Sequence, residues 1–176
     1  VYKRQQVHQA LALLHIQLGQ RRQAKEHARA GFPYRIEDYP YRGRQPAIQV
    51  VVLQSALGGN VVADSWFDDR VFQKTVVTVD FAGDDVQLPP HDLVVNAIGE
   101  ADRCRFALAD AGRMVAQLTV PVVNSPRRVL GTGRIETARR LARIRGAVTP
   151  KIARMARQDV TAAAIAEAGF VWPVLL

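Results

Sequence analysis

The chain has 176 residues, of which 48% are hydrophobic and 23% are charged, and its formal net charge is +8. This composition is ordinary for a globular protein and excludes disorder along the whole chain. No apolar run reaches the roughly 20 residues that a membrane-spanning helix needs, and the start, VYKRQQVHQA, does not have the pattern of a signal peptide. The single cysteine, Cys104, cannot form an internal disulfide, which fits a reducing compartment. We therefore expect a cytoplasmic protein with no membrane partner.

The positive charge is split along the sequence. Residues 1–45 carry nine Lys and Arg against three acids, residues 46–100 carry two against eight, and residues 101–176 carry thirteen against five. A protein that binds nucleic acid usually gathers its excess charge on one face or one helix. The charge excess therefore does not indicate a nucleic-acid partner.

Residues 5–30 have the period of two helices that meet near Gly19. The first helix carries an apolar stripe that alanines resume in the second: Val7, Leu11, Leu14, Leu18, Ala24 and Ala28. The string ALLHIQLGQRRQAKEHARA resembles a tetratricopeptide repeat, in which an LG ends the first helix and spaced alanines occupy the second. One repeat cannot bury its own apolar face, so this interpretation implies that the chain begins within a longer helical array. A plain helical hairpin is the alternative.

The next segment, GFPYRIEDYPYRGRQPA, has three prolines, two glycines and three tyrosines without a sustained period. Such a composition is typical of a linker. We therefore assign residues 1–31 to the helical hairpin and residues 32–47 to a linker.

Strands and helices then alternate. We predict apolar strands at 48–53, 75–81, 93–99 and 121–125, a short helix around 64–72, and a helix over 102–118 with Phe106, Ala109, Met114 and Leu118 facing inward. Apolar strands that alternate with helices indicate a mainly parallel sheet covered on both faces. The fold class expected for residues 48–146 is therefore α/β, with a Rossmann-like three-layer domain.

In such sheets ligands bind at the carboxyl ends of the strands. The residues that the sequence places there are Gly58, Gly59, Asn60, Asn96, Gly99 and Asn124. Two adjacent glycines let backbone N–H groups approach a carboxylate, or they form a tight turn that needs positive φ. Both interpretations stay open.

The segment LGTGRIETARR (130–140) has two glycines followed by several arginines. It is not a dinucleotide loop, because Glu136 occupies the third glycine position and no acid follows at the required distance. Its arginines point in several directions around a helix, which does not indicate a DNA-binding face. We predict a helix that begins after Thr132 or Gly133 and ends near residues 145–146. Its predicted buried stripe is Ile135, Ala138, Leu141 and Ala142.

Arg134 is unusual, because the helix dipole disfavours a cation in the first turn. Either an anionic ligand or contact with solvent accounts for this position of Arg134.

After residue 148 we predict a strand at 149–157, a helix over 159–170 with Asp159 as N-cap and Gly169 as C-cap, and a strand at 171–176. Because an apolar strand is a rare terminus, we expect the sequence to be a fragment.

Other polar residues are weaker candidates. Asp68, Asp69 and Arg70 fit a helix start with an ion pair, or a substrate clamp. His91 follows two prolines and fits a turn. The remaining histidines have no Cys or carboxylate at ligand spacing, so no metal site is predicted: His8, His15 and His27.

From residue 48 onward, the order of elements resembles the amino-terminal part of an ATP-grasp ligase. The stretches that carry the resemblance are VVNSPRRVL, VTPKIARM and VWPVLL. Residues 147–176 match the start of the α+β ATP-grasp domain. The segments SALGGN, FDDRVFQ and LPPHDLVVNAIGEADRCRFAL are similar to a bacterial group that joins tetratricopeptide repeats to an ATP-grasp module.

This resemblance implies ATP-dependent ligation, in which a carboxylate becomes an acyl phosphate that an amine or thiol captures, with ATP and Mg²⁺ as cofactors. It implies that Arg134 and Lys151 contact nucleotide phosphate and that the six strand-end residues hold the carboxylate substrate. The family's metal ligands would lie beyond residue 176, so the fragment alone would not be catalytic. The alternative is a non-catalytic scaffold whose helical repeats bind a protein partner, or an α/β domain that binds a small acid without turnover.

Overall fold

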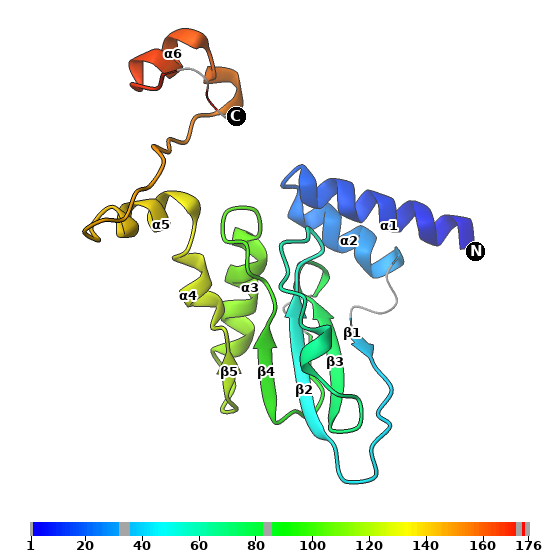
Figure 1. The fold of residues 1–176 in the computed structure, drawn as a ribbon. Helices are drawn as coiled ribbons and strands as arrows, with labels where there is room; N and C mark the ends of the chain where they lie inside the picture. The colour runs from blue at the N-terminus through cyan, green and yellow to red at the C-terminus, as the bar shows by residue number, and fades with distance from the viewer. Residues whose placement is uncertain (1, 32–35, 83–85, 172–173, 175–176) are drawn as a thin grey trace. The chain divides into compact units, whose positions relative to one another are not determined.

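The computed structural model describes residues 2–31, 36–82, 86–171 and 174. The chain forms two compact units, Val1–Gly131 and Thr132–Leu176. Over the described ranges it is an α/β protein with six α-helices and a five-stranded, mainly parallel sheet (Figure 1). In the same ranges no helix combines the length and apolarity needed to cross a membrane.

The sheet belongs to the first unit and has the strand order β1-β3-β2-β4-β5. Only β1 runs antiparallel to its neighbour β3. In the centre of the sheet, Val51 of β2 pairs with Thr75 of β3 and with Val94 of β4. The strands are β1 (Ile36–Asp38), β2 (Ile48–Gln54), β3 (Phe72–Thr78), β4 (Leu93–Asn96) and β5 (Val122–Val123).

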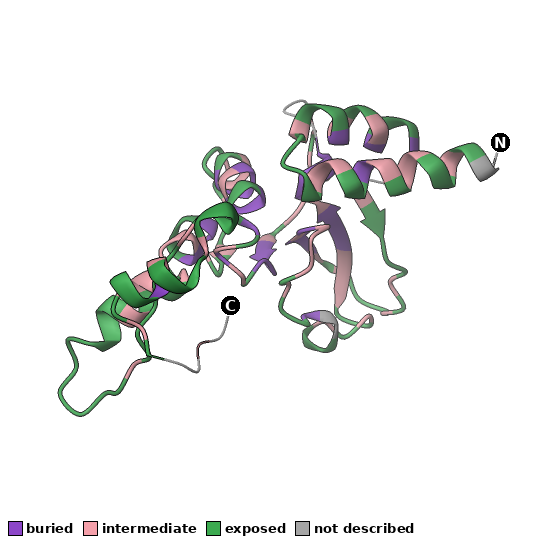
Figure 2. Ribbon diagram, turned by 90° about the horizontal axis from the view of Figure 1, so that it is seen from above, coloured by how far each residue is buried: buried purple, intermediate pink, exposed green. Residues whose placement is uncertain are grey.

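Both faces of the sheet are buried, as unalternating apolar strands require (Figure 2). One face, with Leu53 and Val77, packs against Leu108 and Ala111 of α3 (Arg105–Val115). The other face packs against Phe67 and Phe72 and contributes Val50, Val52, Val76, Val95 and Ala97. The segment that carries Phe67 contains only the short 3-10 helix η1 (Asp64–Trp66).

The secondary structure of this unit differs from the expectations at several places. The helix predicted around 64–72 is η1 followed by a turn in which Asp68 O accepts from the N–H groups of Val71 and Phe72. The backbone of Phe67 is extended (φ −116°, ψ 97°) and ends η1, and its ring packs edge to face on Phe72 with centroids 5.4 Å apart. The strand predicted over 75–81 ends at Thr78, where the 3-10 helix η2 (Val79–Phe81) begins. Strand β1 lies in the predicted linker.

The amino-terminal hairpin consists of α1 (Tyr2–Gln17) and α2 (Arg21–Gly31). Its helices approach closely at small residues, and a Cβ on Gly31 would lie 2.7 Å from Gln9 N. Of the predicted stripe, Ala24 and Ala28 of α2 are fully buried, as expected, whereas Val7 of α1 is 57% exposed and Leu18 is 61% exposed. Instead, α1 uses its opposite side, where Ala12 and Ile16 join the core.

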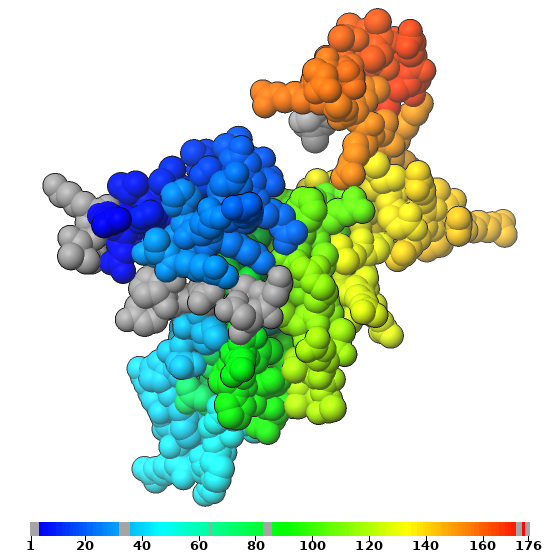
Figure 3. All heavy atoms as spheres, turned by 180° about the vertical axis from the view of Figure 1, so that it is seen from behind, coloured from blue at the N-terminus to red at the C-terminus, as the bar shows by residue number. Residues whose placement is uncertain are grey.

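The hairpin packs over the carboxyl edge of the sheet. Ala12 and Ala28 form a cluster with Ala56, which follows β2, and with Phe81, which follows β3. Arg21 of α2 reaches α3, where its guanidinium lies 5.0 Å from the centroid of the Phe106 ring. Figure 3 shows the hairpin, in blue, against the green part of the first unit. Phe106 is 59% exposed, so its predicted inward position is wrong. The inward residues of α3 are Ala107, Leu108 and Ala111.

The short helix α4 (Pro126–Leu130) closes the first unit, and its Pro126 stands in the first turn, where no N–H is needed. In the second unit, α5 (Arg134–Leu141) begins after Gly133, as predicted. It ends earlier than predicted, because the N–H of Ile144 bonds to Leu141 O in a tighter turn. No residue of α5 is buried, so its predicted apolar stripe does not face a core.

The rest of the second unit contains η3 (Arg157–Asp159) and α6 (Ala162–Glu167). The strand predicted at 149–157 is irregular backbone followed by the start of η3. The N-cap of α6 is Thr161, whose hydroxyl accepts from Ala164 N at 3.1 Å, rather than Asp159. Gly169 has φ +73° and follows the helix, as a glycine C-cap requires. The strand predicted at 171–176 lies mostly outside the described residues, and Val171 is not in a strand.

Candidate functional site

The loop after β2, Ser55–Asn60, folds around the side chain of Asn60. The Oδ1 atom of Asn60 accepts from Ser55 N at 2.8 Å, and its Nδ2 donates to Ser55 O at 2.8 Å. Gly58 and Gly59 have φ of +79° and +70°, which favours glycine at both positions. The tight-turn interpretation is therefore correct. Whether these glycines also approach a carboxylate stays a prediction.

The ends of β4 and β5 are joined by two asparagines. Asn96 is 1% exposed, and its Nδ2 donates to Asn124 O at 3.0 Å. In return, Asn124 Nδ2 donates to Asn96 O at 2.8 Å. The Oδ1 atom of Asn96 also accepts from Ile98 N at 3.1 Å, which fixes the turn that follows β4. Asn124 has φ +56°, a left-handed conformation that asparagine tolerates better than most residues.

Backbone hydrogen bonds join the loops after β2 and β4. The carbonyl of Gly59 accepts from Gly99 N at 2.9 Å and from Glu100 N at 3.1 Å. Asn60 forms an antiparallel bridge with Ile98. A Cβ on Gly59 would lie 2.6 Å from Glu100 Cβ, so the close approach of the two loops also requires this glycine. The structure thus brings together at one edge the six residues that the sequence predicted there.

A buried carboxylate that the sequence did not indicate lies beside these loops. Asp80 of η2 is 6% exposed, and its Oδ2 accepts from Ala56 N at 2.8 Å. Burial raises the pKa of the Asp80 carboxyl above its ordinary value, while hydrogen bonds from Ala56 N and the Ser55 side chain oppose the shift. Asp80 therefore holds the start of the Ser55–Asn60 loop. In the sequence, the only indication of a role for Asp80 was that it is a single acid within an apolar run.

Cys104 lies on the other side of the same loop. It is 1% exposed and immediately precedes α3, and its Sγ donates to Gly58 O at 3.1 Å. Burial raises the pKa of the Cys104 thiol, an effect that the charges of Asp80 and Glu100 reinforce. The thiol thus stays protonated and serves in packing rather than as a nucleophile.

A second buried carboxylate ties the hairpin to α3. Asp110 is 5% exposed, and its two oxygens form ion pairs with Arg21 of α2 and Arg113 of α3. These partners are 89 and 3 residues away in the sequence. Because a buried carboxylate needs a partner, this pair couples the hairpin to the sheet domain.

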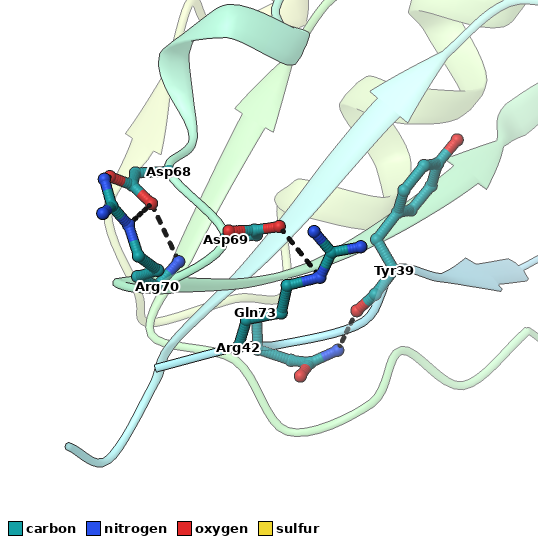
Figure 4. Close-up of polar contacts among 6 residues, drawn as sticks. All are labelled: Tyr39, Arg42, Asp68, Asp69, Arg70 and Gln73. Carbon is teal, nitrogen blue, oxygen red and sulfur yellow. Dashed lines mark hydrogen bonds and ion pairs between the residues drawn. The ribbon is translucent and has the colours of Figure 1, made fainter. Parts of the chain in front are cut away.

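Asp68, Asp69 and Arg70 do not start a helix. They form the turn before β3, at the opposite ends of the strands from the candidate edge (Figure 4). Arg70 Nη2 lies 2.8 Å from Asp68 Oδ2, and Arg42 Nε lies 3.5 Å from Asp69 Oδ2. The pairing with Arg70 lowers the pKa of Asp68 to about 2. These contacts fix the turn and are separate from the candidate site.

The two residues expected to contact nucleotide belong to the second unit. Arg134 is the exposed first residue of α5, and Glu136 in the same turn pairs with Arg140 at 3.4 Å. Lys151 Nζ donates to Gly169 O at 2.8 Å and lies 5.0 Å from the Phe170 ring centroid. In this structure, Lys151 therefore stabilises the segment after α6. A contact of Arg134 with phosphate stays a prediction.

The histidines of the hairpin contact one another. The Nδ1 atoms of His8 and His27 are 2.9 Å apart, and the rings of His15 and His27 are stacked with centroids 5.2 Å apart. Across the residues that the structure describes, no group of three or more His, Cys, Asp and Glu is arranged to hold a metal ion.

The carboxyl edge therefore has loops held in place by side-chain amides, by the buried carboxyl of Asp80 and by hydrogen bonds between backbone groups. Such an edge is suited to binding a small molecule through backbone N–H groups. Comparison of the chain with protein-family models, with curated proteins and with solved structures found no match. The function is therefore inferred from this edge and from the sequence pattern.

Proposed function

We propose that the chain is part of an ATP-dependent ligase of the ATP-grasp type. In this proposal the sheet domain is a Rossmann-like pre-ATP-grasp domain, the hairpin is the end of a tetratricopeptide-like array, and residues 147–176 begin the ATP-grasp domain. The observation that carries the proposal is the meeting of two loops, Ser55–Asn60 and Asn96–Glu100, at the carboxyl edge of a parallel sheet. This edge is where open α/β sheets bind their ligands.

The edge would position the carboxylate substrate. The positive φ of Gly58 and Gly59 turns the backbone without side chains that would cover it. Asn60, Asn96 and Asn124 use their amides to hold the loops, so their contribution is to position the backbone rather than to bind substrate directly. ATP and Mg²⁺ would supply phosphoryl transfer to the carboxylate, and an amine or thiol would then capture the acyl phosphate.

The second unit would contribute to the nucleotide side. Residues 132–176 hold eight Lys and Arg against three acids, which favours an anionic ligand. Arg134 occupies the first turn of α5, beside N–H groups that helices leave unpaired. Lys151 is the weaker member of the predicted pair, because Gly169 O and the Phe170 ring already contact its ammonium group.

The second candidate function is binding of a small acid without turnover. The observation that favours it is that Asp80 and Cys104, which both contact the Ser55–Asn60 loop, are buried. Their side chains bond to backbone groups of the loop, so neither is exposed to a ligand as a general base or a nucleophile. A non-catalytic scaffold would need only the edge and the hairpin.

The test is ATP-dependent phosphate release by the full-length protein in the presence of a panel of small carboxylates together with amine and thiol nucleophiles. A ligase releases phosphate only when carboxylate and nucleophile are both present, whereas a binding protein releases none. We expect Arg134→Ala to weaken ATP binding about tenfold, as loss of one charge-assisted contact does. Arg139→Ala, on the same helix, is the matched control. Unchanged ATP affinity in Arg134→Ala would reject the assigned role of Arg134.

A further inference from the structure

A cavity of about 590 Å³ lies beside α3 in the first unit. Its volume is in the range of small-molecule sites. None of the six residues predicted at the sheet edge lines it. The lining residues come from α2, from the segments around η2 and before β4, and from α3: Lys25, Ala82, Val86, Gln87, Leu88, His91, Asp110, Arg113, Met114, Gln117 and Leu118.

Among the described residues that line the cavity, the charged side chains leave an excess of positive charge. Asp110 is its buried acid, and both carboxylate oxygens are already paired, with Arg21 and with Arg113. Lys25 is half-buried and forms no ion pair or hydrogen bond within the described ranges. Because the single acid has two arginine partners, Lys25 keeps its full attraction for an anion.

His91 also lines the cavity. Its Nδ1 lies 2.7 Å from Pro89 O, and because a carbonyl only accepts, Nδ1 carries the proton. The other ring nitrogen, Nε2, is buried, so other atoms of His91 face the cavity.

Apolar side chains complete the lining. Met114 and Leu118 of α3 face the cavity together with Leu88, which also packs against the core. We propose that this cavity binds a small organic anion with an apolar body, such as an arylacetic acid. Its carboxylate pairs with Lys25, and its apolar body lies against Met114 and Leu118. The site is independent of the proposed ligase function.

The sign of the charge on the bound ligand can be tested directly. Asp84 and Asp85 stand between the lining residues Ala82 and Val86 in the sequence and lie outside the described residues. Three probes of the same shape therefore separate charge from apolar contact: phenylacetate, phenylacetamide and 2-phenylethylamine. Each is titrated calorimetrically into the full chain.

We expect phenylacetate to bind, phenylacetamide to bind about tenfold more weakly, and 2-phenylethylamine not to bind, since the carboxylate has one charged partner. Lys25→Met should weaken phenylacetate binding about tenfold. The matched control is Arg29→Met, which removes an exposed cation from the same helix and should leave binding unchanged. Circular dichroism confirms that both variants are folded.

A second readout follows His91 directly. The ring Cε1–H signal of His91 should shift on addition of phenylacetate, while that of His15 in the hairpin should not. Equal binding of phenylacetate to Lys25→Met and to the wild type would overturn the proposal. So would tighter binding of 2-phenylethylamine, or an unmoved His91 signal at saturation. Because no measurement here involves ATP, failure of the ligase proposal leaves these outcomes unaffected.

Discussion

At the scale of single residues, the buried carboxyl of Asp80 holds a loop in place but lowers the free energy of unfolding at neutral pH. Its carboxyl accepts from Ala56 N, but burial raises its pKa above the ordinary value of 3.8. The folded state then binds a proton more tightly than the unfolded chain does. The stability contributed by this group is therefore complete below the ordinary pKa and is lost as pH rises through the folded-state pKa.

Asp80→Asn should flatten this dependence, because the amide keeps an oxygen for Ala56 N and cannot ionise. We expect the wild type to lose free energy of unfolding relative to the variant as pH rises above the ordinary pKa of 3.8 and through the raised pKa of the folded state. Urea denaturation at a series of pH values measures the difference. Parallel curves for the two proteins would show that Asp80 does not titrate in this window.

Asp68 provides the opposite case, an exposed carboxyl held ionised by a neighbouring guanidinium. Arg70 lowers the pKa of Asp68 to about 2 through its side-chain hydrogen bonds. Arg70→Leu should return this pKa toward 3.8, as followed by NMR titration of the side-chain carboxyl. The control is Arg42→Leu, which removes the partner of Asp69 and should leave Asp68 unchanged. An unaltered pKa in Arg70→Leu would contradict the assigned cause.

Asn96 is expected to contribute more to stability than Asn124, because it is buried and bonds to Ile98 and Asn124. Asn96→Ala leaves those backbone groups unpaired and should cost about 2 to 3 kcal/mol. Asn124→Gly loses one bond and keeps a backbone that tolerates positive φ, so it should cost about 1 kcal/mol or less. Chemical denaturation of both variants tests the ranking, and an equal cost would refute it.

At the scale of elements, α1 is apolar on two opposite sides. Ala12 and Ile16 pack in the core, while Val7, Leu14 and Leu18 remain largely exposed. The spacing of the leucines showed correctly that α1 has a stripe. It did not show which side α2 would cover, because small residues that allow close approach compete with larger residues for that contact.

This arrangement predicts unequal effects of substitution in the hairpin. Leu14→Gln changes a half-exposed position and should alter the free energy of unfolding by less than about 0.5 kcal/mol. Ala28→Leu inserts three carbons at a fully buried position and should cost about 1 to 3 kcal/mol or more. Thermal denaturation measures both. A large cost for Leu14→Gln would mean that the stripe is packed within the chain.

The strands β2 and β4 could be predicted because each is a continuous apolar run, and their ends and following loops placed five of the six edge residues, while Asn124 follows β5. Strand β1 could not, because three residues amid prolines and glycines carry no period. The ion pair of Arg21 with Asp110 joins residues 89 positions apart, and no local pattern encodes such a contact. A lone acid in an apolar run, such as Asp80, likewise gives no indication of its burial.

At the scale of the whole molecule, the two units differ in how much core they have. The first unit contains both faces of the sheet, whereas Ile165 is the only buried residue among those described after Gly131. Irregular, exposed backbone dominates between α5 and α6, where it carries several arginines. Proteases cleave such segments first, because they need little local unfolding.

Limited digestion with trypsin should therefore cut first between residues 142 and 158, at the exposed Arg143, Arg145, Lys151, Arg154 and Arg157. The product containing residues 1–131 should keep the far-ultraviolet circular dichroism of its helices and strands. Mass spectrometry of early time points identifies the cuts. Early cleavage within the hairpin or between residues 36 and 131 would contradict the assignment of stability to the first unit.

The packing of the hairpin over the sheet edge also determines where this chain can be joined to segments of other proteins. A genetic exchange at residues 32–47 would separate Ala28 from Phe81 and Arg21 from Asp110. Any replacement hairpin would have to bring a small residue and a cation at matching positions. Chimaeras joined upstream of α1 preserve both contacts, so the hairpin and the sheet are expected to be inherited and exchanged as one module.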